Sequence, residues 1–146
     1  MNFEVVPLNP EYLDRLLAGA SHITVVAPEL HRTYFSPYSV SCCMLADGEP
    51  VFAGGIVNLQ WNRGEAWMLP TPFFRQHVKT CLRSLKEWMP RMAQSSGFVR
   101  VQATCVKGVS ARILGSLGFS YEGTMQRFGP NGEVCDMYAR IFEVMP

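Results

Sequence analysis

The stretch Ser110-Ala111-Arg112-Ile113-Leu114-Gly115-Ser116-Leu117-Gly118-Phe119-Ser120-Tyr121-Glu122-Gly123 constrains the fold of this chain more than any other. Its residues Ile113, Leu114 and Leu117 recur at helical spacing, which predicts a short helix over 110–117. Gly118 follows the last turn, where glycine often ends a helix because it readily adopts a left-handed conformation. The residues after it predict a strand over 121–128.

Strand and helix patterns continue on both sides of this stretch. Gly129-Pro130-Asn131-Gly132 separates the strand 121–128 from a second apolar run, 134–142, and an Asn-Gly pair between two such runs predicts a hairpin. Upstream, apolar residues at helical spacing predict a long helix that starts at Val78. Pro90 predicts a kink or an early end in that helix. An alternating apolar strand, 98–106, follows it.

The first half of the chain adds four strands and two helices. The strands are expected at 3–7, 40–46, 51–59 and 65–69, and the helices begin at Pro10 and Pro28. Gly54-Gly55 inside the third of these strands is typical of a bulge or of a close approach by another group. The order β-α-α-β-β-β-α-β-α-β-β predicts one α+β domain, residues 1–146, around a central sheet.

Composition excludes several classes of function. The formal net charge of +1 gives no electrostatic case for binding nucleic acid or a membrane surface. No apolar run approaches the ~20 residues of a membrane-spanning helix. The start, Met1-Asn2-Phe3-Glu4, lacks the basic stretch of a signal peptide, so a cytoplasmic protein is expected.

The cysteines predict free thiols in a reducing compartment. Their number is odd and no CxxC spacing occurs; they are Cys42, Cys43, Cys81, Cys105 and Cys135. Buried free cysteines behave as small apolar residues. A zinc site needs clustered ligands, and the sequence offers none.

The element order and four local motifs resemble the GNAT superfamily of N-acetyltransferases. The motifs are the hairpin around Asp47–Gly55, the run Glu65–Leu69 before the long helix, the Leu-Gly-Phe helix end at Leu117–Phe119, and Tyr121-Glu122-Gly123 before the last hairpin. This resemblance implies a mostly antiparallel sheet that splays open between two parallel strands, with helices on both faces. It covers nearly the whole chain.

The resemblance also implies an acetyl-CoA site. Acetyl-CoA would lie between the strands around 65–69 and 101–105, with its pyrophosphate on the free amides at the start of the Val78 helix, where helix geometry favours an anion. The backbone of Met68 and Leu69 would bind the pantetheine arm and stabilise an oxyanion. The phosphate loop of the family then corresponds to Phe74, Arg75, Gln76, His77, Val78 and Lys79.

This loop departs from the family pattern at both small residues, which are His77 and Lys79 here. Such glycines let a phosphate approach the backbone closely. One interpretation is a degraded site; the other is that Arg75, His77 and Lys79 hold the phosphates with their side chains. The family's asparagine before the short helix corresponds to Lys107. The family's acidic tyrosine corresponds to Leu114, which cannot protonate a leaving thiolate.

Two carboxylates are candidates for the general base that amide formation requires. Glu65 begins the strand that carries the base in some GNAT enzymes, and it could act directly or through water. Its alternative role is a hairpin-end carboxylate beside Arg63. Glu122 precedes Gly123 on the next candidate strand, and its alternative role is structural or solvated. A nucleophilic Cys105 would need an adjacent base, and no histidine is identifiably near it.

The sequence therefore leaves two main functions open, with a GNAT-fold domain regulated by an acyl-CoA ligand without turnover as a third possibility between them. The first is an acetyl-CoA-dependent N-acyltransferase that acts by direct transfer to an amine. The second is a catalytically inactive GNAT-fold protein of a phage particle, with phage structural proteins as partners, because Leu114 and the lost glycines resemble the GNAT-like internal virion proteins of T7-type phages. The terminal hairpin edge is available for a homodimer.

Overall fold

The computed structural model describes residues 1–19, 39–69, 71–108 and 110–143. The helical stretch expected from Pro28 lies outside these residues. The described residues form seven strands: β1 Phe3–Pro7, β2 Ser39–Ala46, β3 Glu49–Gln60, β4 Arg63–Leu69, β5 Arg100–Val106, β6 Ser120–Met125 and β7 Cys135–Ile141. They also form four helices: α1 Pro10–Gly19, α3 Pro72–Gln76, α4 Val78–Ser95 and α5 Ala111–Ser116.

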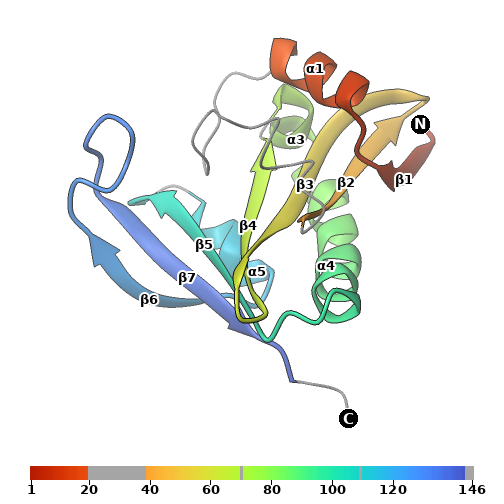
Figure 1. Ribbon diagram of the computed structural model, residues 1–146. Helices are drawn as coiled ribbons and strands as arrows, with labels where there is room; N and C mark the ends of the chain where they lie inside the picture. The colour runs from red at the N-terminus through yellow and green to blue at the C-terminus, as the bar shows by residue number, and fades with distance from the viewer. Residues whose placement is uncertain (20–38, 70, 109, 144–146) are drawn as a thin grey trace.

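All seven strands belong to one mixed sheet, in the order β1-β2-β3-β4-β5-β7-β6. Neighbouring strands are antiparallel except for β4 and β5, which are parallel. Figure 1 shows β4 and β5 diverging toward their carboxyl ends, so that β5, β6 and β7 turn away from the first four strands. The predicted α+β fold with a splayed central sheet is confirmed.

Helices cover both faces of the sheet because the strands alternate apolar residues to each side. On β3, Phe52 and Ile56 belong to the core cluster that includes α4 and α5, whereas Ala53 belongs to a second cluster with Leu13 and Leu16 of α1. The α4 and α5 helices therefore lie on one face and α1 lies on the other, as Figure 1 shows for α1 and α4. We call these the α4/α5 face and the α1 face.

The glycine pair in β3 marks a close approach, as one of its two predicted roles. A Cβ at Gly55 would lie 2.6 Å from the carbonyl oxygen of Val40 and 2.8 Å from Cζ2 of Trp67. Gly54 faces the opposite side, where a Cβ would lie 3.8 Å from Leu85 of α4. The register of β2 and β3 is regular at this pair, and the shifts lie elsewhere.

The short helix α5 ends as the sequence predicts. Gly118 has a φ of +84°, and its amide donates to the carbonyl oxygen of Gly115 at 3.1 Å. The Phe119 amide donates to the carbonyl oxygen of Leu114 at 3.0 Å. These two bonds form a Schellman motif, and the buried side chains of Leu114 and Phe119 join the same core cluster. The motif fixes the direction in which the chain enters β6.

Two expectations about the long helix need correction. Pro90 does not end it early, because α4 runs through Pro90 to Ser95. The residues before it, expected as a loop, include the helix α3, which starts with Pro72 and is capped by the Thr71 hydroxyl accepting from the Phe74 amide at 3.2 Å. The predicted hairpin between β6 and β7 is confirmed. None of the described helices is both long and apolar enough to cross a bilayer.

Candidate functional site

The sheet opens between β4 and β5. These strands pair at only three positions: Arg63 with Arg100, Gly64 with Val101 and Glu65 with Gln102. Beyond Glu65, β4 keeps its partners on β3, and beyond Gln102, β5 keeps its partners on β7. Residues 66–69 and 103–106 therefore face each other across the opening without pairing between β4 and β5.

An open-sided cavity lies at this opening, on the α4/α5 face; its 590 Å³ of space includes open solvent at the mouth, and the part that a water-sized molecule can occupy is about 50 Å³. Its lining comes from the two separating strands, from β3 behind them and from both helices. The lining residues are Gly54, Gly55, Ala66, Trp67, Met68, Leu85, Met89, Met92, Ala103, Thr104, Cys105, Ser110, Ile113, Leu114, Leu117 and Phe119. The opening and the cavity together form the candidate active site.

Glu65 lies at the point where the two strands part. It is the last β4 residue paired with β5, and its Oε1 lies 3.5 Å from the hydroxyl of Thr104, a residue of the cavity lining. Burial raises the pKa of the Glu65 carboxyl, while the Thr104 hydrogen bond and the Arg63 charge oppose that rise. A carboxylate with a raised pKa accepts a proton more readily than an exposed one.

Glu122, the second candidate base, is held in an ion pair. Its oxygens accept two hydrogen bonds from the Arg100 guanidinium, at 2.9 and 2.5 Å. The hydrogen bond from Arg100 lowers the pKa of Glu122, because it favours the charged carboxylate. The residue lies on β6, beside the register shift between Tyr121 and Gly123. This geometry matches the structural role that the sequence left open for it.

The candidate phosphate loop lies at the junction of α3 and α4. His77 ends α3 and precedes α4 with a φ of −127°, a conformation that does not require glycine. Its imidazole stacks on Phe73 with ring centroids 4.3 Å apart, and no side chain hydrogen bond caps α4. Arg75, Gln76 and Lys79 are exposed around this helix start. The amides of the first turn of α4, beginning with Val78, therefore remain available to an anion.

The residues on the other side of the opening are apolar or peripheral. Leu114 is buried and lines the cavity at the position where the family resemblance would place a tyrosine. Lys107 follows β5; its amide donates to the carbonyl oxygen of Val134 at 2.9 Å, and its side chain is exposed. Met68 lines the cavity, whereas the Leu69 side chain is buried on the α1 face, so Leu69 could offer only its backbone.

Cys105 lines the cavity as an inert thiol rather than as a nucleophile. Burial, with a smaller contribution from the charge of Asp136, raises its pKa to about 11. A thiol with this pKa carries very little thiolate at neutral pH, and the thiolate is the reactive form. All five cysteines are free.

Sequence reasoning missed two parts of this site. Thr104 was not identified as the partner of Glu65, and the apolar residues of α4 were identified only as core. The helical spacing of Leu85, Met89 and Met92 was visible in the sequence, but spacing does not reveal an empty volume beside a helix.

Comparison with known proteins agrees with the fold. No protein-family model matches the chain, and no curated protein matches it in sequence. Among solved structures, an acetyltransferase of the GNAT family from Streptococcus pneumoniae is 15% identical, with a TM-score of 0.75 over 97% of this chain and 100% of that one. A ribosomal-protein alanine N-acetyltransferase from Escherichia coli is 12% identical, with a TM-score of 0.76 over 99% and 97%.

A third similar structure is a ribosomal-protein alpha-N-acetyltransferase solved in complex with coenzyme A. It is 15% identical, with a TM-score of 0.75 over 97% of this chain and 94% of that one. At these identities the likeness concerns architecture. The chain therefore has the GNAT fold along almost its whole length, and its chemistry has to be argued from its own residues.

Proposed function

We propose that this protein is an acyl-CoA-dependent N-acyltransferase that transfers an acetyl group directly to an amine. The position of Glu65 carries the proposal. A half-buried carboxylate with a raised pKa stands where β4 and β5 part, within hydrogen-bonding distance of Thr104, a residue of the cavity lining. A perturbed carboxylate beside a cavity is a strong candidate for a functional site.

The residues around the opening fit an acyl-CoA molecule. The uncapped start of α4 offers amides and the positive end of a helix dipole to the pyrophosphate, and Arg75, Gln76, His77 and Lys79 surround it. The unpaired edge of β4 offers the peptide groups of Met68 and Leu69 to the amide-containing pantetheine arm. Lys107 lies beyond the carboxyl end of β5 and could contact a further phosphate.

The transfer itself needs one proton acceptor and one oxyanion donor. Glu65 accepts a proton from the attacking amine, directly or through a water molecule, as the new carbon–nitrogen bond forms. A peptide N–H of β4 stabilises the oxygen of the tetrahedral intermediate. The carbon–sulfur bond then breaks, and the sulfur leaves with the bonding electrons. Leu114 offers it no proton, so the thiolate is protonated by water.

The test is release of the CoA thiol from acetyl-CoA in the presence of spermidine or a peptide with an N-terminal alanine. We expect Glu65→Gln to lower turnover by about a hundredfold or more and to leave acetyl-CoA affinity nearly unchanged. Glu122→Gln serves as the comparison, since Glu122 is engaged with Arg100, and it should stay within a few fold of the wild type. Equal turnover of the wild type and Glu65→Gln would remove Glu65 from the chemistry.

A catalytically inactive GNAT-fold protein is the second candidate. Two observations favour it: Leu114 stands where a proton donor would be expected, and His77 and Lys79 replace the small residues of the phosphate loop. The similar structures give no support to a phage-particle role. Absence of both acetyl-CoA binding and turnover would favour this candidate over the enzyme.

A further inference from the structure

The cavity is longer than an acetyl group requires. Along α4 its wall runs from Leu85 to Met92, a seven-residue separation that spans about 10 Å at 1.5 Å per residue. It extends from the open ends of β4 and β5 back to residues beside their last paired positions, Ala66 and Ala103. It also passes beneath β4 as far as Gly54 of β3. An acetyl group, only two carbons long, does not reach along the whole of this wall.

The wall of the cavity is almost entirely apolar. Of the described residues that line it, none is charged, and Thr104 and Ser110 are the only hydroxyl-bearing ones. Small residues keep the interior open, since Gly54, Ala66 and Ala103 project a methyl group or less into it. Burying a polar group here would cost free energy, because the wall offers few hydrogen-bonding partners.

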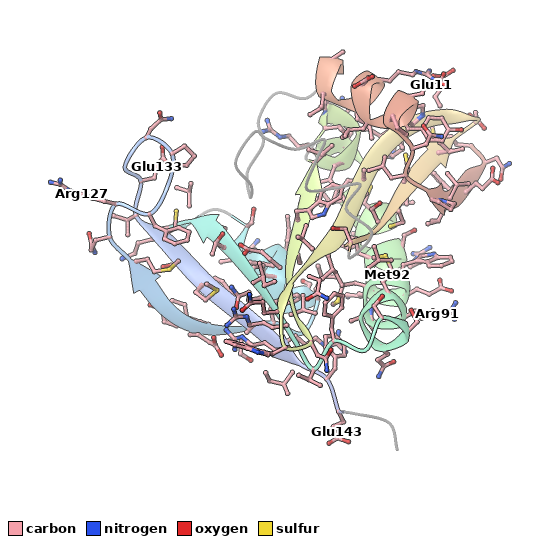
Figure 2. The ribbon with its side chains drawn as sticks, in the orientation of Figure 1. Glu11, Arg91, Met92, Arg127, Glu133 and Glu143 are labelled. Atoms are coloured by element: carbon pink, nitrogen blue, oxygen red, sulfur yellow. The ribbon has the colours of Figure 1, made fainter. Side chains whose placement is uncertain are left out.

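The floor of the cavity can adjust to an occupant. Met89 and Met92 lie there on α4, which Figure 2 shows with Met92 labelled. Methionine is unbranched and flexible, and it fills irregular apolar spaces or yields them at little cost. Leu114 completes the wall from α5 with another aliphatic side chain.

We propose that the preferred donor is an acyl-CoA with a saturated chain of medium length, whose chain occupies this cavity between the sheet and the two helices. The inference rests on the proposed function and extends its acyl group from acetyl to a longer chain. The reaction balances as for acetyl: the acyl carbon–sulfur bond breaks, the amide bond forms, one amine proton goes to Glu65, and the leaving sulfur takes a proton from water.

A chain attached to the thioester fits the cavity better than a separate acceptor does. The cavity opens onto the gap where the thioester would lie, so the chain reaches it without leaving the site. Glu65, which would receive the amine proton, alternates with Ala66 along β4 and therefore points to the α1 face. The acceptor amine is thus expected on the α1 face, and the acyl chain on the α4/α5 face.

The experiment is a calorimetric titration of the full chain with CoA and with acetyl-, butyryl-, hexanoyl-, octanoyl- and decanoyl-CoA, each below its micelle-forming concentration. We expect the dissociation constant to fall with chain length, by up to about fourfold per buried methylene, equivalent to roughly 0.8 kcal/mol. Equal affinities from acetyl- to octanoyl-CoA would overturn the chain proposal alone. No binding of any member, CoA included, would overturn the proposed function with it.

Variants of the cavity wall distinguish binding of the acyl chain inside the cavity from nonspecific adsorption of the chain to the protein surface. Ala103→Val adds two methyl groups to the wall and should remove most of the gain in affinity from acetyl-CoA to octanoyl-CoA, measured as the ratio of the two dissociation constants within the variant. Ala53→Val is the matched control, a buried strand alanine on the α1 face, and should keep the wild-type series. Met92→Ala should move the optimum to a longer chain, so the proposal stays testable if Ala103→Val fails to fold. The proposal would be contradicted if the dependence of the dissociation constant on chain length were the same in the wild type, Ala103→Val and Met92→Ala.

Discussion

At the scale of single residues, the Glu65 side chain affects both the stability of the fold and the proposed chemistry. Its carboxyl is half-buried where the two strands separate, with one hydroxyl contact at 3.5 Å and the charge of Arg63 nearby. These contacts do not offset the cost of burying its charge, since its pKa is raised. Glu65 is therefore expected to lower the free energy of unfolding at neutral pH, while its raised pKa makes it a better base.

The pH dependence of stability follows from that shift. Between the ordinary Glu pKa of 4.5 and its raised folded-state value, the native state binds more protons than the unfolded state. The contribution of Glu65 to the free energy of unfolding therefore falls as pH rises through this window. We predict that Glu65→Gln becomes more favourable relative to the wild type as pH rises from 4.5 to neutrality, measured by urea unfolding. A difference that is independent of pH would contradict the assignment.

Gly55 tests the packing of β3 against Trp67. Gly55→Ala is expected to destabilise the protein by about 1–3 kcal/mol, because the new methyl group would overlap the Val40 carbonyl and the Trp67 ring. Gly123→Ala is the control, since nothing lies within 4 Å of a Cβ there. Thermal unfolding of both variants measures the difference, and equal midpoints would show that Trp67 moves aside freely.

The site residues show where sequence reasoning stops. That Glu65 lies near the start of a strand could be predicted from the apolar run after it, although β4 begins two residues earlier than expected, at Arg63. The contact of Glu65 with Thr104 could not be predicted, because the two residues are 39 positions apart and only the register of two parallel strands brings them together.

At the scale of elements, the features that neighbouring residues determine, such as helix ends and turns, could be predicted from short sequence motifs. The end of α5 at Gly118 and the turn before β7 depend on neighbouring residues, and both were predicted. Of the two outcomes predicted for Pro90, a kink or an early end, the early end is wrong, because α4 continues past it with Met89 and Met92 buried in the core on either side. Tertiary packing of an apolar face can outweigh the local cost of a proline. Helix α3 was missed because it is only five residues long, although Thr71-Pro72 carries a helix-start signal.

Two glycines, Gly115 within α5 and Gly118 just after it, give a matched pair of substitutions that tests the end of this helix. Gly118→Ala is expected to cost about 1–2 kcal/mol, since position 118 has a left-handed conformation that a Cβ disfavours. Gly115→Ala is expected to stabilise the protein by about 0.5–1 kcal/mol, because Gly115 is exposed within the helix and nothing lies near its Cβ position. Opposite shifts in the unfolding midpoint are predicted, and equal shifts would contradict the Schellman assignment.

The proposed phosphate site at the start of α4 can be tested by substituting a basic residue near it. Arg75→Ala is expected to weaken acetyl-CoA binding by about 1.5–3 kcal/mol, the range for a hydrogen bond to a charged group. Arg75 lies on α3, just before α4. Arg91→Ala is the control toward the other end of α4 (Figure 2), where Arg91 pairs with Glu87 at 3.4 Å, and it should leave binding unchanged. Titration calorimetry compares the two variants. Unchanged affinity in Arg75→Ala would mean that backbone amides alone hold the phosphates.

At the scale of the whole molecule, the account depends on how the sheet opens. The alternating strands and the order of elements predicted one sheet with helices on both faces, and the structure has that arrangement. The three-residue pairing of β4 and β5 turns it into a site, because it exposes two strand edges above an apolar cavity. The central claim is that an acyl-CoA binds in this opening.

The most direct test is amide hydrogen exchange with and without millimolar acetyl-CoA, resolved by peptide along the chain. We predict protection in the peptides that contain residues 66–69 and 78–80, with no change in those covering the β6–β7 hairpin loop. This pattern would place the ligand on the β4 edge and at the start of α4. Unchanged exchange throughout the chain would mean that the fold is retained without a CoA site, and would contradict the central claim.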